Sequence, residues 1–232
     1  MTVMSSCVLI TGATGLVGRG LATHFAGRGY RVALTARDSG RLESLAAEIG
    51  AAAWQSSDLA DAASLKRLVE HLDAASASPD VLINNAADVT SKPLLDTALD
   101  EIDHLLRVNV IGALQLTRLI APSMISRGNG TIVNISSLAG FKPNRAQTVY
   151  SVSKSAVNAM SEALRAELGP RGIHCVNVAL MGVGDGPGRV SMDVVARRIA
   201  RAINDREPDV FFYWRTKWLM RLYGALPALM RR

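Results

Sequence analysis

The sequence of 232 residues has only two cysteines, Cys7 and Cys175, and each lies in an apolar run typical of a buried strand. Such positions favour small core residues in a reducing compartment over a disulfide. The four histidines are scattered through the chain without the spacing of metal ligands, so no metal site is predicted.

Long hydrophobic runs are also missing. No stretch of 18 or more apolar residues occurs, and we therefore expect no transmembrane helix. The first residues enter a strand-like run without a basic region before it, so we expect no signal peptide and a cytoplasmic location.

Net charge is absent from most of the chain. Residues 1–188 hold 16 Lys/Arg and 16 Asp/Glu, whereas residues 189–232 hold 10 Lys/Arg and 4 Asp/Glu and so account for the whole excess of +6. The basic character belongs to the C-terminal part. This distribution argues against a nucleic-acid-binding face on the main body.

Short apolar runs alternate with helical patterns along the whole chain. The predicted strands are 7–12, 31–36, 51–55, 80–84, 131–136, 173–179 and 209–213, and the predicted helices lie near 17–28, 40–49, 61–75, 96–121, 150–168 and 191–205. Continuously apolar strands indicate a sheet that helices cover on both faces. The alternation predicts one α/β domain over 1–213, a Rossmann-type doubly wound parallel sheet of about seven strands.

The first predicted strand runs into three glycines, Gly12, Gly15 and Gly18, and then into a helix. Glycines at this position let backbone amides approach a pyrophosphate, which the positive end of the helix also attracts. A glycine triad alone is weak evidence, but its place between the first strand and the first helix predicts a dinucleotide site.

The end of the second strand distinguishes the two nicotinamide cofactors. The strand ends at Ala36, and Arg37 follows as a guanidinium suited to the 2′-phosphate of NADP. Asp38 comes next, and a shift of one residue in the boundary would make it a ligand for the 2′-hydroxyl of NAD. We expect NADPH as the preferred cofactor and keep NAD as the alternative.

A tyrosine and a lysine stand four residues apart, Tyr150 and Lys154, at the start of a predicted helix. They should therefore lie one turn apart on one face. Taken alone, this pair is more often part of an ordinary surface helix.

Together with other short motifs, however, the chain resembles the short-chain dehydrogenase/reductase family in its compact single-domain branch. The matching segments occur in the family's order, namely TGATGLVG at 11–18, DL at 58–59, NNAA at 84–87, Asn109, ISS at 135–137 and YSVSK at 150–154. Each is short, but the ordered set is specific and covers nearly the whole chain.

The resemblance implies a catalytic set of Asn109, Ser137, Tyr150 and Lys154. Tyr150 would exchange a proton with the substrate oxygen, and the Lys154 ammonium, with an oxidised nicotinamide, would lower the pKa of its phenol from about 10. Ser137 would donate a hydrogen bond to the substrate, and Asn109 would help to hold a water that relays protons to Lys154. The implied cofactor-binding residues are Gly12, Thr14, Gly15, Leu16, Gly18, Arg37, Asp58, Leu59, Asn84, Asn85, Tyr150, Lys154, Gly182 and Val183.

Three features depart from the family's pattern. The glycine spacing resembles that of the longer branch that modifies nucleotide sugars, although this chain is too short for that branch's substrate domain. Ala87 stands where glycine is usual. No threonine follows the sixth strand to hold the nicotinamide carboxamide, so backbone groups of Gly182 and Val183 are expected to orient the ring.

The C-terminal tail, 214–232, carries five positive charges and no negative one, with Trp214, Trp218, Leu222 and Leu226 at four-residue spacing. Two interpretations remain open. The tail is either an amphipathic helix on an anionic membrane surface or a terminal helix that packs on its own domain or on a second copy.

The preferred function is an NADPH-dependent carbonyl reductase, which is an alcohol dehydrogenase in the reverse direction. Its substrate would be a ketone or aldehyde of a lipid, of an acyl-carrier thioester or of a small secondary metabolite, with a 3-oxoacyl thioester as the nearest variant. The alternatives are a catalytically idle NADP-binding protein that senses redox state or assists assembly, and a nucleotide-sugar enzyme. By resemblance we expect a homodimer or homotetramer.

Overall fold

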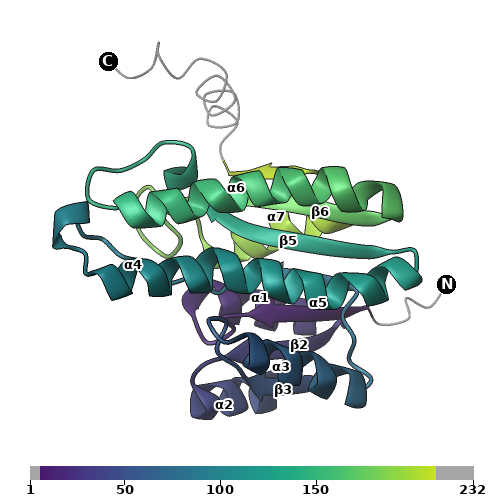
Figure 1. Ribbon diagram of the computed structural model, residues 1–232. Helices are drawn as coiled ribbons and strands as arrows, with labels where there is room; N and C mark the ends of the chain where they lie inside the picture. Colours follow the sequence, from purple (N-terminus) through teal and green to yellow (C-terminus); the bar gives the residue numbers. More distant parts are fainter. Residues whose placement is uncertain (1–5, 213–232) are drawn as a thin grey trace.

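The computed structural model describes residues 6–212, which form a seven-stranded parallel sheet with helices on both faces (Figure 1). This confirms the predicted doubly wound fold. The strands are β1 Cys7–Thr11, β2 Arg31–Ala36, β3 Ala53–Ser56, β4 Val81–Asn84, β5 Gly130–Ser137, β6 Ile173–Leu180 and β7 Asp209–Phe211. The predicted tail, 214–232, lies outside the described residues.

The strand order is β3-β2-β1-β4-β5-β6-β7. The chain therefore builds outwards from β1 to one side, returns, and continues from β4 on the other side. The connections that follow β1 and β4 run in opposite directions along the sheet. They therefore leave a crevice at the carboxyl ends of these two strands. This crevice is where ligands of open α/β sheets bind.

Two layers of helices bury the sheet. The α-helices are α1 Leu16–Gly27, α2 Ser39–Ile49, α3 Ala62–Ala74, α4 Leu99–Leu106, α5 Ala113–Ser126, α6 Thr148–Leu168 and α7 Met192–Asn204. One core includes Leu21 and Phe25 of α1 and Ile199 of α7, and the other includes Leu68 of α3 and Leu116 of α5. Apolar strands with both faces covered follow from this arrangement.

The single helix predicted over 96–121 is divided in the structure. A π-helical turn, Arg107–Gly112, separates α4 from α5. Gly112 is required there, since a Cβ at this position would lie 2.3 Å from the carbonyl oxygen of Leu59. The continuous segment Leu99–Ser126 is long and apolar enough to span a membrane by length and composition, but half of its most apolar window is buried in the domain.

A row of asparagines crosses the sheet. Asn84, Asn134 and Asn177 stand at paired positions of β4, β5 and β6, and all three are buried. The Nδ2 of Asn84 donates to the Oδ1 of Asn134 at 2.9 Å, and the Nδ2 of Asn134 donates to Ser161 on α6 at 3.0 Å. This asparagine row is a polar seam within an otherwise apolar core.

Candidate active site

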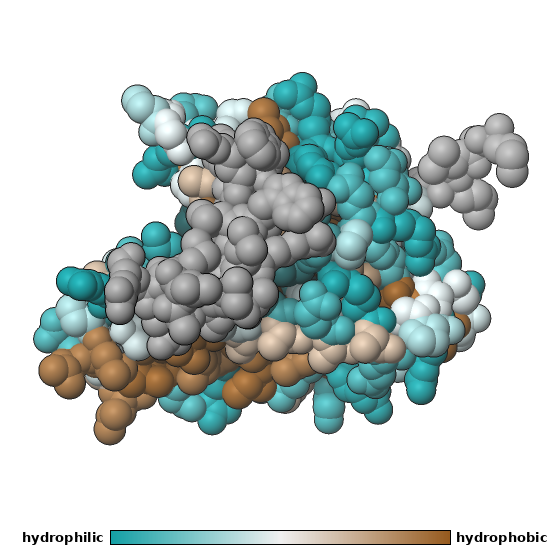
Figure 2. All heavy atoms as spheres, turned by 90° about the horizontal axis from the view of Figure 1, so that it is seen from above, coloured by the Kyte–Doolittle hydropathy of each residue, from teal (hydrophilic) through white to brown (hydrophobic). Residues whose placement is uncertain are grey.

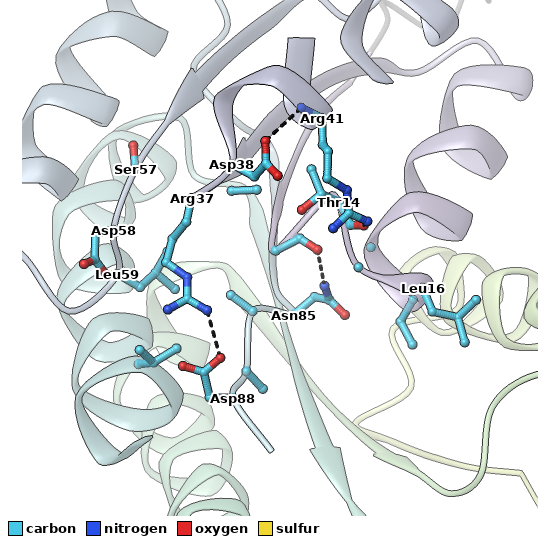
Figure 3. A pocket seen from close by; sticks show the side chains of 18 of the residues that line it. Thr14, Leu16, Arg37, Asp38, Arg41, Ser57, Asp58, Leu59, Asn85 and Asp88 are labelled. Atoms are coloured by element: carbon cyan, nitrogen blue, oxygen red, sulfur yellow. Dashed lines mark hydrogen bonds and ion pairs between the residues drawn. The ribbon is translucent and has the colours of Figure 1, made fainter. Parts of the chain in front are cut away.

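A cavity of about 480 Å³ lies at the carboxyl ends of β1, β2 and β4 (Figure 3). Nine of the predicted cofactor-binding residues line it, namely Gly12, Thr14, Gly15, Leu16, Gly18, Arg37, Asp58, Leu59 and Asn85. Ala87, the departure from the family's glycine, also lines the cavity. The cavity lies where the order of the strands reverses, which is the expected binding place of a dinucleotide.

The glycine turn between β1 and α1 leaves no room for side chains. Gly12 has a φ of +63°, and a Cβ there would lie 2.7 Å from the Cα of Ala86. A Cβ on Gly18 would lie 2.2 Å from the carbonyl oxygen of Gly12. The turn thus places backbone, not side chains, beside the first amides of α1, as a cradle for a pyrophosphate requires.

We expect Gly18→Ala to destabilise the fold by about 2 kcal/mol and to weaken dinucleotide binding, because its Cβ meets backbone that cannot move aside. Gly27→Ala is the matched control, since no heavy atom lies within 4 Å of a Cβ there. Thermal unfolding and titration with NADPH measure the two effects. Equal stability and affinity in both variants would contradict the role of the tight turn.

Asn85 holds the glycine turn against β4. Its Nδ2 donates to the carbonyl oxygens of Thr11 at 2.8 Å and Gly12 at 3.2 Å, and its backbone N–H donates to Thr11 Oγ1 at 3.0 Å. The prediction for Asn84 requires correction. Asn84 does not line the cavity, because its side chain points into the asparagine row and towards Thr117 of α5.

The helix that follows β2 helps to decide which of Arg37 and Asp38 is available to bind the cofactor. β2 ends at Ala36 as predicted, and the Oδ1 of Asp38 accepts a hydrogen bond from the backbone N–H of Arg41 at 3.0 Å as the N-cap of α2. Such a cap favours a helix start by about 1 kcal/mol. Asp38 therefore has a structural use of its own, whereas the Arg37 side chain extends along the cavity (Figure 3).

Arg41 is a cavity residue that the sequence analysis did not identify. Its guanidinium donates to the carbonyl oxygen of Thr14 at 3.0 Å, across the cavity wall (Figure 3). The available signal was its spacing, since Arg41 follows Arg37 by four residues in the first turn of α2. Two arginines, Arg37 and Arg41, thus line the cavity.

Ser137, Tyr150 and Lys154 meet beside the carboxyl end of β5. Ser137 ends β5, Tyr150 lies in the first turn of α6, and the Ser137 side chain is close enough to the phenol to lower its pKa. The Nζ of Lys154 lies 5.7 Å from the centre of the Tyr150 ring and donates to the carbonyl oxygen of Ile135 at 2.8 Å. The structure therefore brings together three of the four predicted catalytic residues.

Burial determines the proton affinity of this pair. Burial raises the pKa of Tyr150, and the neighbouring Ser137 side chain offsets this in part. Burial lowers the pKa of Lys154 to about 8. The expected lowering of the tyrosine pKa is thus not found in the protein alone, because the Lys154 ammonium points to a backbone carbonyl and the phenol is desolvated.

Asn109, the fourth predicted residue, is buried within the π-helical turn. Its Oδ1 accepts from the backbone N–H of Asp88 at 2.8 Å, and its Nδ2 donates to the Asp88 carbonyl oxygen at 2.9 Å. Nδ2 also donates to Ser153 at 3.1 Å, and Ser153 donates to the carbonyl oxygen of Tyr150. The side chain braces the segment after β4 against α6, and the water relay stays a prediction.

Gly182 and Val183 lie outside the cavity, in a loop closed by its own hydrogen bonds. The carbonyl oxygen of Gly182 accepts from the Val190 N–H at 2.9 Å, and that of Val183 accepts from Arg189 at 2.9 Å. Their contact with the nicotinamide stays a prediction.

A family model described as short chain dehydrogenase matches residues 6–188. The chain belongs to the short-chain dehydrogenase family. A short-chain dehydrogenase from Sphingobium yanoikuyae, solved in complex with NADPH, is similar to it with 30% identity and a TM-score of 0.85, over 97% of this chain and 95% of that one. The chain is therefore an NAD(P)-dependent oxidoreductase of this family.

Two other relatives of this short-chain dehydrogenase are informative. A very-long-chain 3-oxoacyl-CoA reductase of Phaeosphaeria nodorum is 34% identical over 189 residues, which are 75% of this chain and 54% of the relative. An uncharacterized oxidoreductase of Staphylococcus aureus is 27% identical over 199 residues, which are 84% and 83% of the two chains. The first shows that the likeness extends to a longer protein.

Proposed function

We propose that this short-chain dehydrogenase reduces the carbonyl group of a ketone or aldehyde with NADPH. The observation that carries the proposal is the half-buried Tyr150 phenol, which lies beside Ser137 and one helical turn from Lys154. A tyrosine with a raised pKa holds its proton at neutral pH. That is the protonation state in which a general acid begins the reduction.

When bound, the nicotinamide supplies the hydride. The chain then has to bind and protonate the carbonyl oxygen as it becomes negative. Because Ser137 and Tyr150 are within hydrogen-bond reach of each other, both can point to one oxygen, where Ser137 donates a hydrogen bond and Tyr150 gives up its proton. The Lys154 ammonium, held by Ile135, stabilises the phenolate that remains.

NADPH is the proposed cofactor because Arg37 and Arg41 both line the cavity. Guanidinium groups bind phosphate with two parallel hydrogen bonds. Similar solved structures include one in complex with NADPH and a metagenomic short-chain oxidoreductase in complex with NADP, which is 31% identical to this chain. NAD is the alternative.

The relatives support a carbonyl substrate without fixing its size. One similar structure, 26% identical, is a ketone-specific alcohol dehydrogenase from Comamonas testosteroni described as specific for bulky-bulky ketones, and one relative is the 3-oxoacyl-CoA reductase. The decisive assay follows NADPH oxidation with a panel of ketones, aldehydes and 3-oxoacyl thioesters, with NADH alongside. Binding of NADPH without oxidation by any carbonyl would favour the idle NADP-binding alternative.

We further propose that the enzyme is a homodimer or homotetramer. Leu95 and Leu99 have 97% and 85% of their surface exposed, and Ile111, Leu114 and Val152 are also exposed. Figure 2 shows hydrophobic residues gathered along the lower edge of the view. This edge is the front of the molecule in Figure 1, where α4 and α5 lie. A contiguous apolar patch of this kind favours a protein partner.

Replacing Leu95 and Leu99 together with glutamate should reduce the mass in solution to that of one chain, because two charges would be buried in the contact. Light scattering after size exclusion measures it. Val194→Glu, at an exposed position of α7, is the control. A monomeric wild-type protein would contradict the proposal.

A further inference from the structure

Asp88, in the segment after β4, is bound to the arginine that is proposed to recognise the cofactor. Its Oδ1 accepts from the Nη2 of Arg37 at 3.1 Å, and its Oδ2 lies 2.8 Å from the Nε2 of His104 on α4. The Nη1 of Arg37 also lies 3.4 Å from that ring nitrogen. Three side chains from separate parts of the sequence thus form one cluster, of which Arg37 and Asp88 line the cavity (Figure 3).

Charged side chains of both signs line the cavity. Two arginines, Arg37 and Arg41, face three carboxylates, Asp38, Asp58 and Asp88. Asp38 accepts from the N–H of Arg41, and Asp58 accepts from the N–H of Ala60 at 2.9 Å. Of the three carboxylates that line the cavity, Asp88 is the one with an ion pair to a cavity arginine.

The position of Asp88 is fixed by its backbone. Both its N–H and its carbonyl oxygen are bound to Asn109, which is itself buried. The carboxylate is therefore held beside Arg37 by the π-helical turn. A change of the side chain alone leaves this support intact, because Asn109 contacts only the main chain of Asp88 among the described contacts.

We propose that Asp88 is a specificity-determining residue that limits the preference of the enzyme for NADPH over NADH; this rests on the proposed function. Because Asp88 accepts from the Nη2 of Arg37, a 2′-phosphate that binds the same guanidinium either displaces the carboxylate or lies beside it, and both arrangements leave two anionic groups close together. A 2′-hydroxyl carries no charge, and it can donate a hydrogen bond to a carboxylate. Asp88 therefore penalises NADPH and not NADH, and the enzyme can use both.

The test is calorimetric titration of the full chain with NADPH and with NADH. Asp88→Asn keeps the shape and removes the charge, so the Kd for NADPH should fall about fivefold, the upper range of an exposed ion pair, while that for NADH stays equal or rises. Asp103→Asn is the matched control, because Asp103 on α4 pairs with Arg107 at the start of the π-helical turn and does not line the cavity. It should leave both constants unchanged.

A second pair of variants shows whether the effect passes through Arg37. In an Arg37→Ala background, Asp88→Asn should shift the ratio of the two constants by less than twofold, because the competition for the guanidinium is gone. An unchanged ratio in Asp88→Asn, with both nucleotides bound, overturns this inference alone. Failure of the wild-type protein to bind either nucleotide overturns both the inference and the proposed function.

Discussion

Replacing Tyr150 with phenylalanine should lower the rate of carbonyl reduction about 10³-fold, within the range that a general acid contributes. The change removes one oxygen, the phenol oxygen beside Ser137 at the end of β5. The aromatic ring stays, and Tyr150 does not line the cofactor cavity, so the Kd for NADPH should change less than twofold. Stopped-flow or steady-state NADPH oxidation measures the rate, and titration measures the Kd.

Tyr30→Phe is the matched control for this experiment. Tyr30 loses the same oxygen, but its partly buried ring packs edge-on against Phe25 of the core, at 5.1 Å between centroids. It should keep the wild-type rate. Normal turnover by the Tyr150 variant would show that another group protonates the substrate, and the mechanism proposed above would be wrong.

Replacing Lys154 with methionine should have two opposite effects. The rate should fall at least about 100-fold, because the phenolate loses its neighbouring cation. The free energy of unfolding at pH 7 should rise by about 2 kcal/mol. Burying an ammonium costs roughly 3 kcal/mol for a pKa lowered from its usual 10.5 to about 8, and the lost hydrogen bond to Ile135 offsets about 1 kcal/mol of the gain.

The pH dependence identifies the cause of this gain. Below about pH 8 the lysine is protonated in both the folded and the unfolded chain, so the full cost of burial is present. Between about pH 8 and 10.5 the unfolded chain holds more protons, and the stability that this group contributes rises with pH. The advantage of the methionine variant should therefore shrink across this window.

Urea unfolding at pH 7 and at pH 9.5 measures the gain in the free energy of unfolding and its dependence on pH. Lys66→Met, at an exposed position of α3, is the control and should show little difference at either pH. A Lys154 variant that is less stable than the wild type at pH 7 would contradict the assigned cost of burial. A surviving gain at pH 9.5 as large as that at pH 7 would contradict its electrostatic origin.

The fold was predictable because several strands, such as β1 and β4, are short apolar runs that need cover on both faces. The π-helical turn was not, since Arg107–Gly112 has the apolar pattern of an ordinary helix. Its cause is tertiary, namely the approach of Gly112 to Leu59 and the hold of Asn109 on Asp88. Neither contact has a signal in the local sequence.

The candidate site was predictable where a motif carries its own geometry. The glycine turn and the Tyr150–Lys154 spacing belong to this class. The shift of the Tyr150 pKa was not predictable, because its direction depends on burial by residues distant in the sequence. Asp88 was missed for the same reason, since its partners Arg37 and His104 lie 51 and 16 residues away.

The asparagine row has a consequence for the alignment of the strands. Residues alternate between the two faces of a sheet, so sliding β5 by one position against its neighbours would turn Asn134 into the aliphatic layer and present Val133 or Ile135 to Ser161. The amides thus penalise misalignment more heavily than interchangeable aliphatic side chains could. Ser137 lies three positions further along the same strand. Its position along β5 is thereby fixed relative to the Tyr150 hydroxyl on α6.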